Sequence, residues 1–279
     1  MKRIRYILTV GVFLSLLCSD AFAFIGVNPK LFAEAYDETI NFHRDGDNTI
    51  TSGHLIEGLK ATSDGFVKST ELYLKQRYGS DANKDYWNNR GEMILGGRIR
   101  FFSKIYLAFF YEYIFGWYMG DTNQTNPNPY GDSFRDTRYG LIFWQGADKE
   151  YAKERNQHFP LSFWDEIYAD AIHYQKDDNN VASFTNIRAG YRLLRIHKTV
   201  FDVYSAWYFA WDINKDYWNN KFELGPGLRI KPWDDLELSL FVEFLNGYYI
   251  DRNGRYPLPG GKEFNDRRYG VLFWHGLGF

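Results

Sequence analysis

The sequence has almost no cysteine: of 279 residues only Cys18 is one, and it lies near the amino terminus. A single cysteine leaves no disulfide framework to hold the fold together. Long apolar runs are also missing, since beyond the amino terminus none approaches the ~20 apolar residues of a membrane-spanning helix. No sign of charge dominates either, because 33 Lys and Arg residues stand against 35 Asp and Glu residues. This balance gives no reason to expect nucleic acid as a partner.

The amino terminus is the one strongly apolar segment. Three of the first five residues are basic, residues 6–17 are apolar, and Ala-Phe-Ala at 21–23 fits a signal-peptidase site. The apolar run is too short for a membrane anchor. A lipid-modified Cys18 is disfavoured because Leu17, which is not a small residue, precedes it. We therefore predict a cleaved signal peptide at 1–23 and an exported protein at 24–279.

Aromatic residues are unusually frequent. They make up 20% of the chain, beside 24% charged residues, and the mean hydropathy is −0.46. A transmembrane β-barrel reconciles many rings with many charges, because only alternate residues face lipid and aromatic residues gather at the membrane interfaces. The carboxyl-terminal segment alternates in the same way and ends in Phe279. This ending resembles the signal that the barrel-assembly machinery reads on bacterial outer-membrane barrels.

The hexamer KDYWNN occurs at 84–89 and again at 215–220, which indicates an internal repeat. Residues that follow each copy match at a spacing of 130 or 131 positions. The matched pairs include Glu92 and Glu223, Arg98 and Arg229, Glu112 and Glu243, Gly116 and Gly247, and Trp144 and Trp274. We predict one barrel made of two six-strand halves at about 31–147 and 163–279, joined by a linker at 148–162.

Apolar and polar residues alternate with a period of two between turn-forming segments, as expected of strands with unlike faces. The predicted strands span 31–42, 49–61, 66–78, 90–101, 105–119, 136–147, 163–176, 182–195, 200–213, 221–231, 236–250 and 267–279. Twelve is an even number, as closure with both termini on one side requires. The fold class is thus an all-β antiparallel transmembrane barrel.

Lipid requires an apolar outer face, so the polar members of each strand should face the interior. The lumen-lining candidates are Glu92, Arg98, Arg100, Glu112, Arg138, Glu223, Arg229, Lys231, Glu237, Glu243 and Arg268. In one interpretation they form ion pairs that fill and stiffen a narrow interior. In the other they line a water-filled path and set its selectivity, as charged rings do in pores. Aromatic rings that the alternation also places inward, among them Trp144 and Trp274, would suit a saccharide when they lie beside arginines.

The repeated hexamer places aromatic residues at the border of loop and strand. The candidates are Tyr86, Trp87, Tyr217 and Trp218. Two roles remain open for them. They could anchor the barrel at the membrane interface, or they could stack sugar rings at the mouth.

An outer-membrane lipid-modifying enzyme is a third possibility, and the sequence supports it least. Ser52-Gly53-His54 is the nearest hint of a nucleophile beside a base. No acidic partner is evident for it, and Glu57 lies on the opposite strand face. We predict no catalytic residue and no cofactor. We also predict no metal site, since no Cys, His, Asp or Glu residues follow one another at the spacing of metal ligands.

The segment 217–247, YWNNKFELGPGLRIKPWDDLELSLFVEFLNG, resembles a hairpin of the carboxyl-terminal barrels in the exopolysaccharide-export and phage-adsorption protein A families. In those barrels a Trp-Asn entry leads to a Gly-x-Gly-x-Arg strand and then to an acidic strand. The resemblance implies carbohydrate export or surface reception. The helical-repeat region that usually precedes such barrels is missing, so a partner would have to deliver a polymer.

The sequence as a whole resembles porin-like outer-membrane barrels of bacteria. Its expected location is the bacterial outer membrane, in contact with outer-membrane lipid and lipopolysaccharide. The expected function is a channel for a small or polymeric polar solute, with a saccharide as the favoured one. The main alternative is a non-conducting structural or surface-receptor barrel that contacts phage, another cell or lipid.

Overall fold

The computed structural model describes residues 29–103, 105–119, 131–146, 162–233, 236–250 and 261–278. The predicted signal peptide, nearly all of the predicted linker and Phe279 lie outside these ranges. Those assignments therefore stay predictions. Within the described ranges, no helix is long and apolar enough to cross a membrane.

Twelve strands follow one another along the described parts of the chain. They are β1 (Lys30–Phe42), β2 (Asn48–Thr62), β3 (Ser69–Asp81), β4 (Arg90–Arg100), β5 (Tyr106–Tyr118), β6 (Ser133–Gly146), β7 (Ser162–Tyr174), β8 (Asn180–Ile196), β9 (Thr199–Asp212), β10 (Lys221–Lys231), β11 (Glu237–Tyr249) and β12 (Glu263–Gly278), with a 3-10 turn η1 (His43–Asp45) after β1. Each strand pairs with its neighbours in sequence, and β1 pairs antiparallel with β12. The predicted antiparallel barrel of twelve strands is confirmed.

Four strand boundaries differ from those predicted by three residues or more, among them the end of β3, which is Asp81 rather than 78. β3 begins at Ser69 rather than 66, because the backbone of Ser63 and Lys68 closes a longer turn with a 3.1 Å hydrogen bond. β6 and β12 begin three and four residues earlier than predicted. Their first residues are polar and read as loop, but Ser133 pairs with Trp117 and Glu263 pairs with Tyr248. Backbone pairing with the neighbouring strand therefore extends β6 and β12 into polar residues that the sequence pattern assigned to loops.

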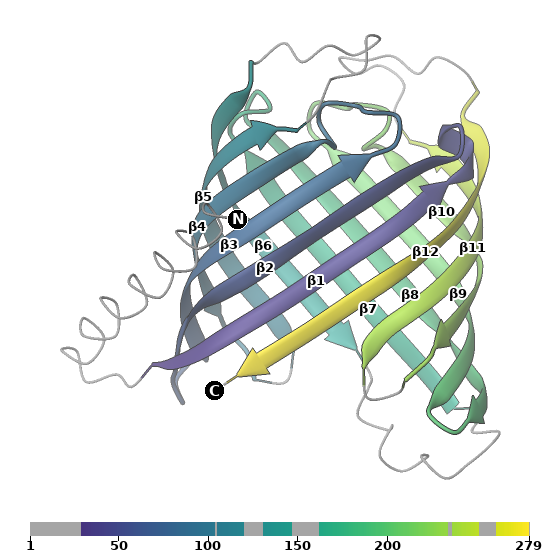
Figure 1. The fold of residues 1–279 in the computed structure, drawn as a ribbon, viewed down its shortest axis with the longest axis horizontal. Coiled ribbons are helices and arrows are strands. Elements are labelled where there is room, and N and C mark those ends of the chain that lie inside the picture. Colours follow the sequence, from purple (N-terminus) through teal and green to yellow (C-terminus); the bar gives the residue numbers. More distant parts are fainter. Residues whose placement is uncertain are drawn as a thin grey trace.

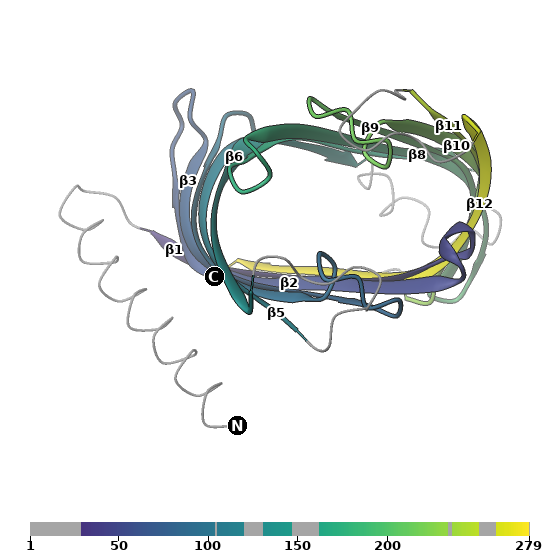
Figure 2. The same ribbon diagram turned by 90° about the horizontal axis from the view of Figure 1, so that it is seen from above.

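The barrel is flattened into an oval (Figure 2). The strands β12, β1 and β2 form one long wall, and β6, β7 and β8 form the opposite one (Figure 1). The narrow ends are made by β3–β5 and by β9–β11. We call the end that carries the KDYWNN loops the upper end, and the end where β1 begins and β12 finishes the lower end (Figure 1).

Strand alternation separates the two faces of the wall. On β5, Phe109, Tyr111 and Phe115 are exposed on the outside, whereas Ala108 and Glu112 are buried on the inside. The other strands at the narrow ends alternate in the same way. A belt of large apolar side chains therefore faces outward, as lipid requires of a membrane barrel.

Inward glycines let tyrosine rings lie flat against the wall. A Cβ atom on Gly96 would stand 2.4 Å from the Tyr73 ring, and one on Gly227 would stand 2.4 Å from the Tyr204 ring. Both rings are buried, with 4% of each residue exposed. The glycines thus create the space in which these tyrosines approach the ionic groups of the interior.

We predict that Gly227→Ala destabilises the barrel by about 1–3 kcal/mol, because the added methyl group overlaps the packed Tyr204 ring. Urea unfolding followed by tryptophan fluorescence would measure the change. Gly261→Ala is the matched control, since a Cβ there meets no atom within 4 Å. Equal midpoints for the two variants would contradict this packing.

Candidate functional site: the interior of the barrel

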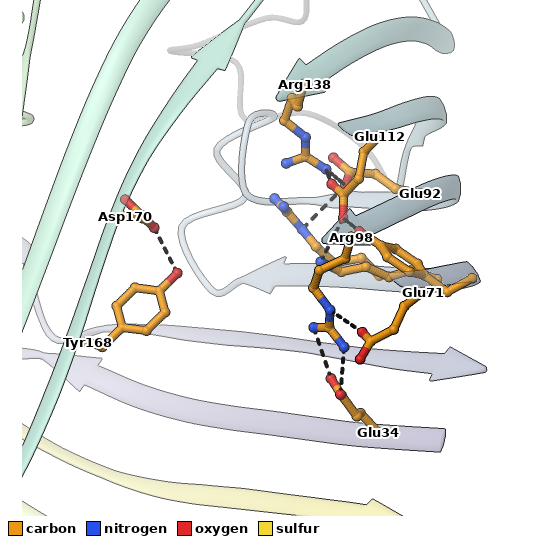
Figure 3. Close-up of polar contacts among 11 residues, drawn as sticks. Glu34, Glu71, Glu92, Arg98, Glu112, Arg138, Tyr168 and Asp170 are labelled. Carbon is orange, nitrogen blue, oxygen red and sulfur yellow. Dashed lines mark hydrogen bonds and ion pairs between the residues drawn. The ribbon is translucent and has the colours of Figure 1, made fainter. Parts of the chain in front are cut away.

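An ion-pair network fills the narrow end made by β3–β5. Arg98 on β4 contacts Glu71 on β3 at 2.5 Å and Glu34 on β1 at 2.7 Å (Figure 3). The three residues come from separate strands, which the barrel's closure brings together. Arg98 and Glu71 are buried, at 9% and 2% exposure. Burial of a charge is tolerated when it is paired and hydrogen-bonded in this way.

A second group of charges lies farther up the same end. Arg138 on β6 contacts Glu92 at 3.1 Å and Glu112 at 3.5 Å (Figure 3). Glu112 also accepts a 3.1 Å hydrogen bond from the Tyr73 hydroxyl and lies 3.3 Å from Lys75. The carboxylates of β4 and β5 therefore hold cations that reach them from strands on either side.

The opposite narrow end, made by β9–β11, repeats these contacts. Arg229 on β10 contacts Asp202 at 2.8 Å and Glu166 at 2.7 Å. Arg268 on β12 pairs with Glu223 on β10. Each of these residues occupies the position that Arg98, Glu71, Glu34, Arg138 or Glu92 holds at the first end.

Glu243 is the most enclosed carboxylate of the second network. It accepts hydrogen bonds from the hydroxyls of Tyr204 at 2.9 Å and Tyr208 at 2.7 Å. Arg188, from β8, contacts it at 3.1 Å. The exposure of Glu243 is 0%, so its charge depends entirely on these partners.

All the lumen-lining candidates predicted from the sequence face the interior, but most do not line its accessible surface. Nine of the eleven are buried, namely Glu92, Arg98, Glu112, Arg138, Glu223, Arg229, Lys231, Glu243 and Arg268. Glu237 is 41% exposed beside Lys231, and Arg100 donates to the backbone carbonyl of Phe102 at 3.0 Å, both at the lower end. The arrangement favours the interpretation in which ion pairs fill and stiffen part of the interior.

The accessible inner surface lies instead on the two long walls. On β1, the Tyr36 hydroxyl donates to Glu38 at 2.5 Å, and Trp274 of β12 is the strand neighbour of Tyr36. On β7, the Tyr168 hydroxyl donates to Asp170 at 2.8 Å (Figure 3), where Trp144 of β6 is the neighbour. The two tryptophans are 45% and 46% exposed, and the tyrosines and carboxylates are partly exposed.

These two groups face each other across the flattened interior. Their strands form the two long walls, which lie opposite each other in the flattened barrel (Figure 2). We call them the wall groups: Trp274, Tyr36 and Glu38 on one side, and Trp144, Tyr168 and Asp170 on the other. Sequence reasoning placed the tryptophans inward but missed the other members, because β1 and β7 are among the least alike parts of the two halves. The shared pattern of tyrosine followed two residues later by a carboxylate was the available signal.

Ser52 and His54 also face the interior, on β2. The Ser52 hydroxyl donates to Glu38 at 3.1 Å, and the His54 ring stacks on Tyr36 with centroids 5.3 Å apart. Among the described residues, no hydrogen bond joins Ser52 to His54. The arrangement lacks the nucleophile-to-base contact on which covalent catalysis depends.

The KDYWNN hexamer folds back onto the strand that precedes it. At the second copy, the Asp212 carboxylate accepts hydrogen bonds from the side chains of Asn219 at 2.7 Å and Asn220 at 2.8 Å. The backbone N–H of Asp216 donates to the same carboxylate at 3.0 Å. The loop is therefore held by one buried aspartate at the strand end.

The first copy is built in the same way around Asp81. Its carboxylate accepts from the Asn88 side chain at 2.6 Å and from the Asn83 backbone at 2.7 Å. The Asp81 backbone N–H donates to the Asn89 side chain at 3.1 Å. The asparagines of the hexamer thus have a structural role, which accounts for their presence in both loops.

The aromatic candidates of the hexamer divide into two kinds. Tyr86 and Tyr217 each pack edge-on against the inward tyrosine at the end of β5 or β11, with centroids 5.6 and 5.4 Å apart. Trp87 and Trp218 remain 43% and 42% exposed. The tyrosines therefore belong to the inner rim, and the tryptophans suit the interface-anchoring role.

Basic residues of two upper turns cover the same inner rim. Lys176 donates to the Tyr118 hydroxyl at 2.6 Å and lies 3.9 Å above the centre of the Phe134 ring. Arg44 lies 3.6 Å above the Phe264 ring at the opposite end. Burial lowers the pKa of both side chains. The upper turns thus fold over the narrow ends of the oval.

Among the residues that the structure describes, no group of three or more His, Cys, Asp or Glu side chains is arranged to hold a metal ion.

Comparison with known proteins gives only distant similarities. No protein-family model matches the sequence, and no curated protein matches it. The β domain of the Bordetella autotransporter BrkA is 12% identical, with 88% of this chain and 98% of that one covered at a TM-score of 0.37. The translocator domain of the autotransporter NalP from Neisseria meningitidis is 9% identical, covers 98% and 97% of the two chains, and has a TM-score of 0.30. OpdQ from Pseudomonas aeruginosa is 10% identical, covers 90% and 99%, and has a TM-score of 0.29.

Similarities this low identify neither a family nor a function for the chain. The assignment of the fold depends on the barrel's own strand pairing and side-chain distribution. An even number of antiparallel strands, complete closure, an apolar outer belt and a polar interior occur together in bacterial outer-membrane barrels. The chain therefore has the architecture of a bacterial outer-membrane β-barrel.

We predict that Glu243→Gln costs about 3–5 kcal/mol of stability, because it leaves the buried Arg188 without its carboxylate. Glu263→Gln is the control: it makes the same chemical change at an exposed carboxylate at the start of β12, where a loss of ~1 kcal/mol or less is expected. Urea unfolding in detergent micelles would compare them. Similar losses would show that the buried network is not a main source of stability.

We also predict that Asp212→Ala loosens the second KDYWNN loop, because three loop groups lose their common acceptor. Amide hydrogen exchange of residues 213–220 should accelerate, while that of 82–89 at the other loop stays unchanged. Unaltered exchange at 213–220 would contradict the structural role of the aspartate.

Proposed function

We propose that this outer-membrane barrel is a channel for a polar solute, and that the solute is a saccharide. Support comes from the division of the interior into two parts. The narrow ends are occupied by buried ion pairs, whereas the long walls keep exposed inward side chains. The observation that carries the proposal is the pair of facing wall groups, each with a tryptophan, a tyrosine and a carboxylate.

Aromatic faces beside hydrogen-bonding groups are suited to sugar rings. The C–H surface of a sugar packs on an aromatic face, and its hydroxyls donate to carboxylates. Trp144 and Trp274 lie near the lower end, so a solute would meet them next to the periplasmic opening. Tyr36 and Tyr168 continue the aromatic surface toward the middle of the walls.

Membrane lipid and lipopolysaccharide surround the outer belt in this proposal, and the barrel-assembly machinery inserts the chain. A catalytic role is not part of it, since the Ser52 hydroxyl is engaged by Glu38. The alternative of a non-conducting surface or structural barrel is favoured by one observation. The upper turns cover the narrow ends, where Lys176 and Arg44 lie above inward rings.

The proposal is tested by recording ion current through the refolded protein in planar bilayers, with neutral oligosaccharides added. Steady current with sugar-dependent interruptions is expected. Trp144→Ala combined with Trp274→Ala should weaken sugar binding roughly tenfold, since two aromatic contacts contribute about 0.5–1.5 kcal/mol each.

Trp87→Ala is the matched control, because this tryptophan is similarly exposed but lies in an upper KDYWNN loop, at the other end of the barrel from Trp144 and Trp274. It should leave the interruptions unchanged. No current at any voltage would support the non-conducting barrel. Current that sugar does not affect would support the channel function and contradict the proposal that its solute is a saccharide.

A further inference from the structure

Two inward carboxylates differ from those of the narrow ends. Glu38 on β1 accepts hydrogen bonds from the hydroxyls of Tyr36 at 2.5 Å and Ser52 at 3.1 Å. Asp170 on β7 accepts from the Tyr168 hydroxyl at 2.8 Å and from the backbone of Phe184 at 3.0 Å. Within the described part of the chain, neither carboxylate forms a salt bridge. Neutral donors orient them without cancelling their charge.

The two carboxylates hold equivalent places on the opposite walls. Glu38 is the strand neighbour of Leu272, and Asp170 is the neighbour of Ile142. Each therefore has an apolar side chain on one flank and projects from the middle of a long wall. Both are partly exposed inside the barrel.

The arginines of the interior are arranged in the opposite way. Arg98 and Arg229 each contact two carboxylates, and Arg138 contacts two as well. Their positive charge is locally compensated and buried at the narrow ends. The side chains of Arg77 and Arg90 are 28% and 30% exposed, but they lie at a narrow end and contact Glu92. In the middle of the long walls, a solute meets the carboxylates of Glu38 and Asp170.

We infer that Glu38 and Asp170 determine the charge selectivity of the interior, so that it admits cations and neutral saccharides and rejects anionic saccharides. This inference depends on the proposed channel function and narrows its substrate class. Carboxylates at a constriction attract cations and repel anions, and the effect is strong where little water screens the charge. From the sequence, the inward arginines were expected to meet the saccharide, whereas Arg98 and Arg229 are paired with carboxylates.

The test is the reversal potential of refolded protein in a potassium chloride gradient. Wild-type protein should prefer potassium over chloride severalfold. Glu38→Gln combined with Asp170→Asn should bring the two permeabilities close to equal, because both amides keep the hydrogen-bonding shape and lose the charge. In liposomes, oligogalacturonate should enter much more slowly than a neutral oligosaccharide of equal length, and the double variant should reduce that difference.

Glu57→Gln is the matched control, since this glutamate lies on β2 but on the outward face. It should leave the reversal potential unchanged. Current with no cation preference, or a preference that the double variant retains, would overturn the inference and leave the channel intact. Absence of current from the wild-type protein would instead overturn the channel function, and the inference with it.

Discussion

The barrel depends on the contacts that buried arginines such as Arg98 and Arg229 make inside it with carboxylates of other strands. The apolar side chains of every strand face the surrounding lipid, so the polar side chains must lie in the interior. An unpaired guanidinium in that interior would cost several kcal/mol. Arg98 avoids this cost by reaching strands β1 and β3 from β4, and Arg229 does the same from β10. The pairing therefore ties together strands that are not all neighbours in the sheet.

The same pairing explains why the interior is divided. The charged networks lie at the two narrow ends of the oval, with tyrosines packed over glycines beside them. The long walls then have few ion pairs to fill them and retain partly exposed rings and carboxylates. Charge that stiffens the barrel and surface that could meet a solute are thus carried by different residues, often of one strand: on β1, Glu34 pairs with Arg98 while Glu38 accepts from the Tyr36 hydroxyl. This separation allows the wall groups to vary without unpairing the buried arginines.

Much of this arrangement could be predicted from alternation and repetition. Strand number, strand order and the inward direction of residues such as Arg98 and Glu243 follow from a period of two under an apolar outer face. The contacts of those residues could not be predicted, because they depend on how the barrel flattens. The alternation does not say which inward residues become buried. Tyr36 and Asp170 were missed for a related reason, since β1 and β7 have little sequence in common. The role of the asparagines in KDYWNN was also missed, because Asp81 and Asp212, whose carboxylates or backbone bond to them, lie outside the hexamer.

The division of the interior can be measured with two nearly isosteric cysteine substitutions. The chain has no cysteine after Cys18, so one introduced thiol at a time reports its own surroundings. Ser52 is a partly exposed residue of a long wall, and Ser239 is a buried residue of a narrow end, with 6% exposure. The two variants are Ser52→Cys and Ser239→Cys. In proteoliposomes, a water-soluble cationic thiol reagent should label the first rapidly and the second slowly or not at all. Equal labelling of both, or faster labelling of the narrow end, would contradict the account.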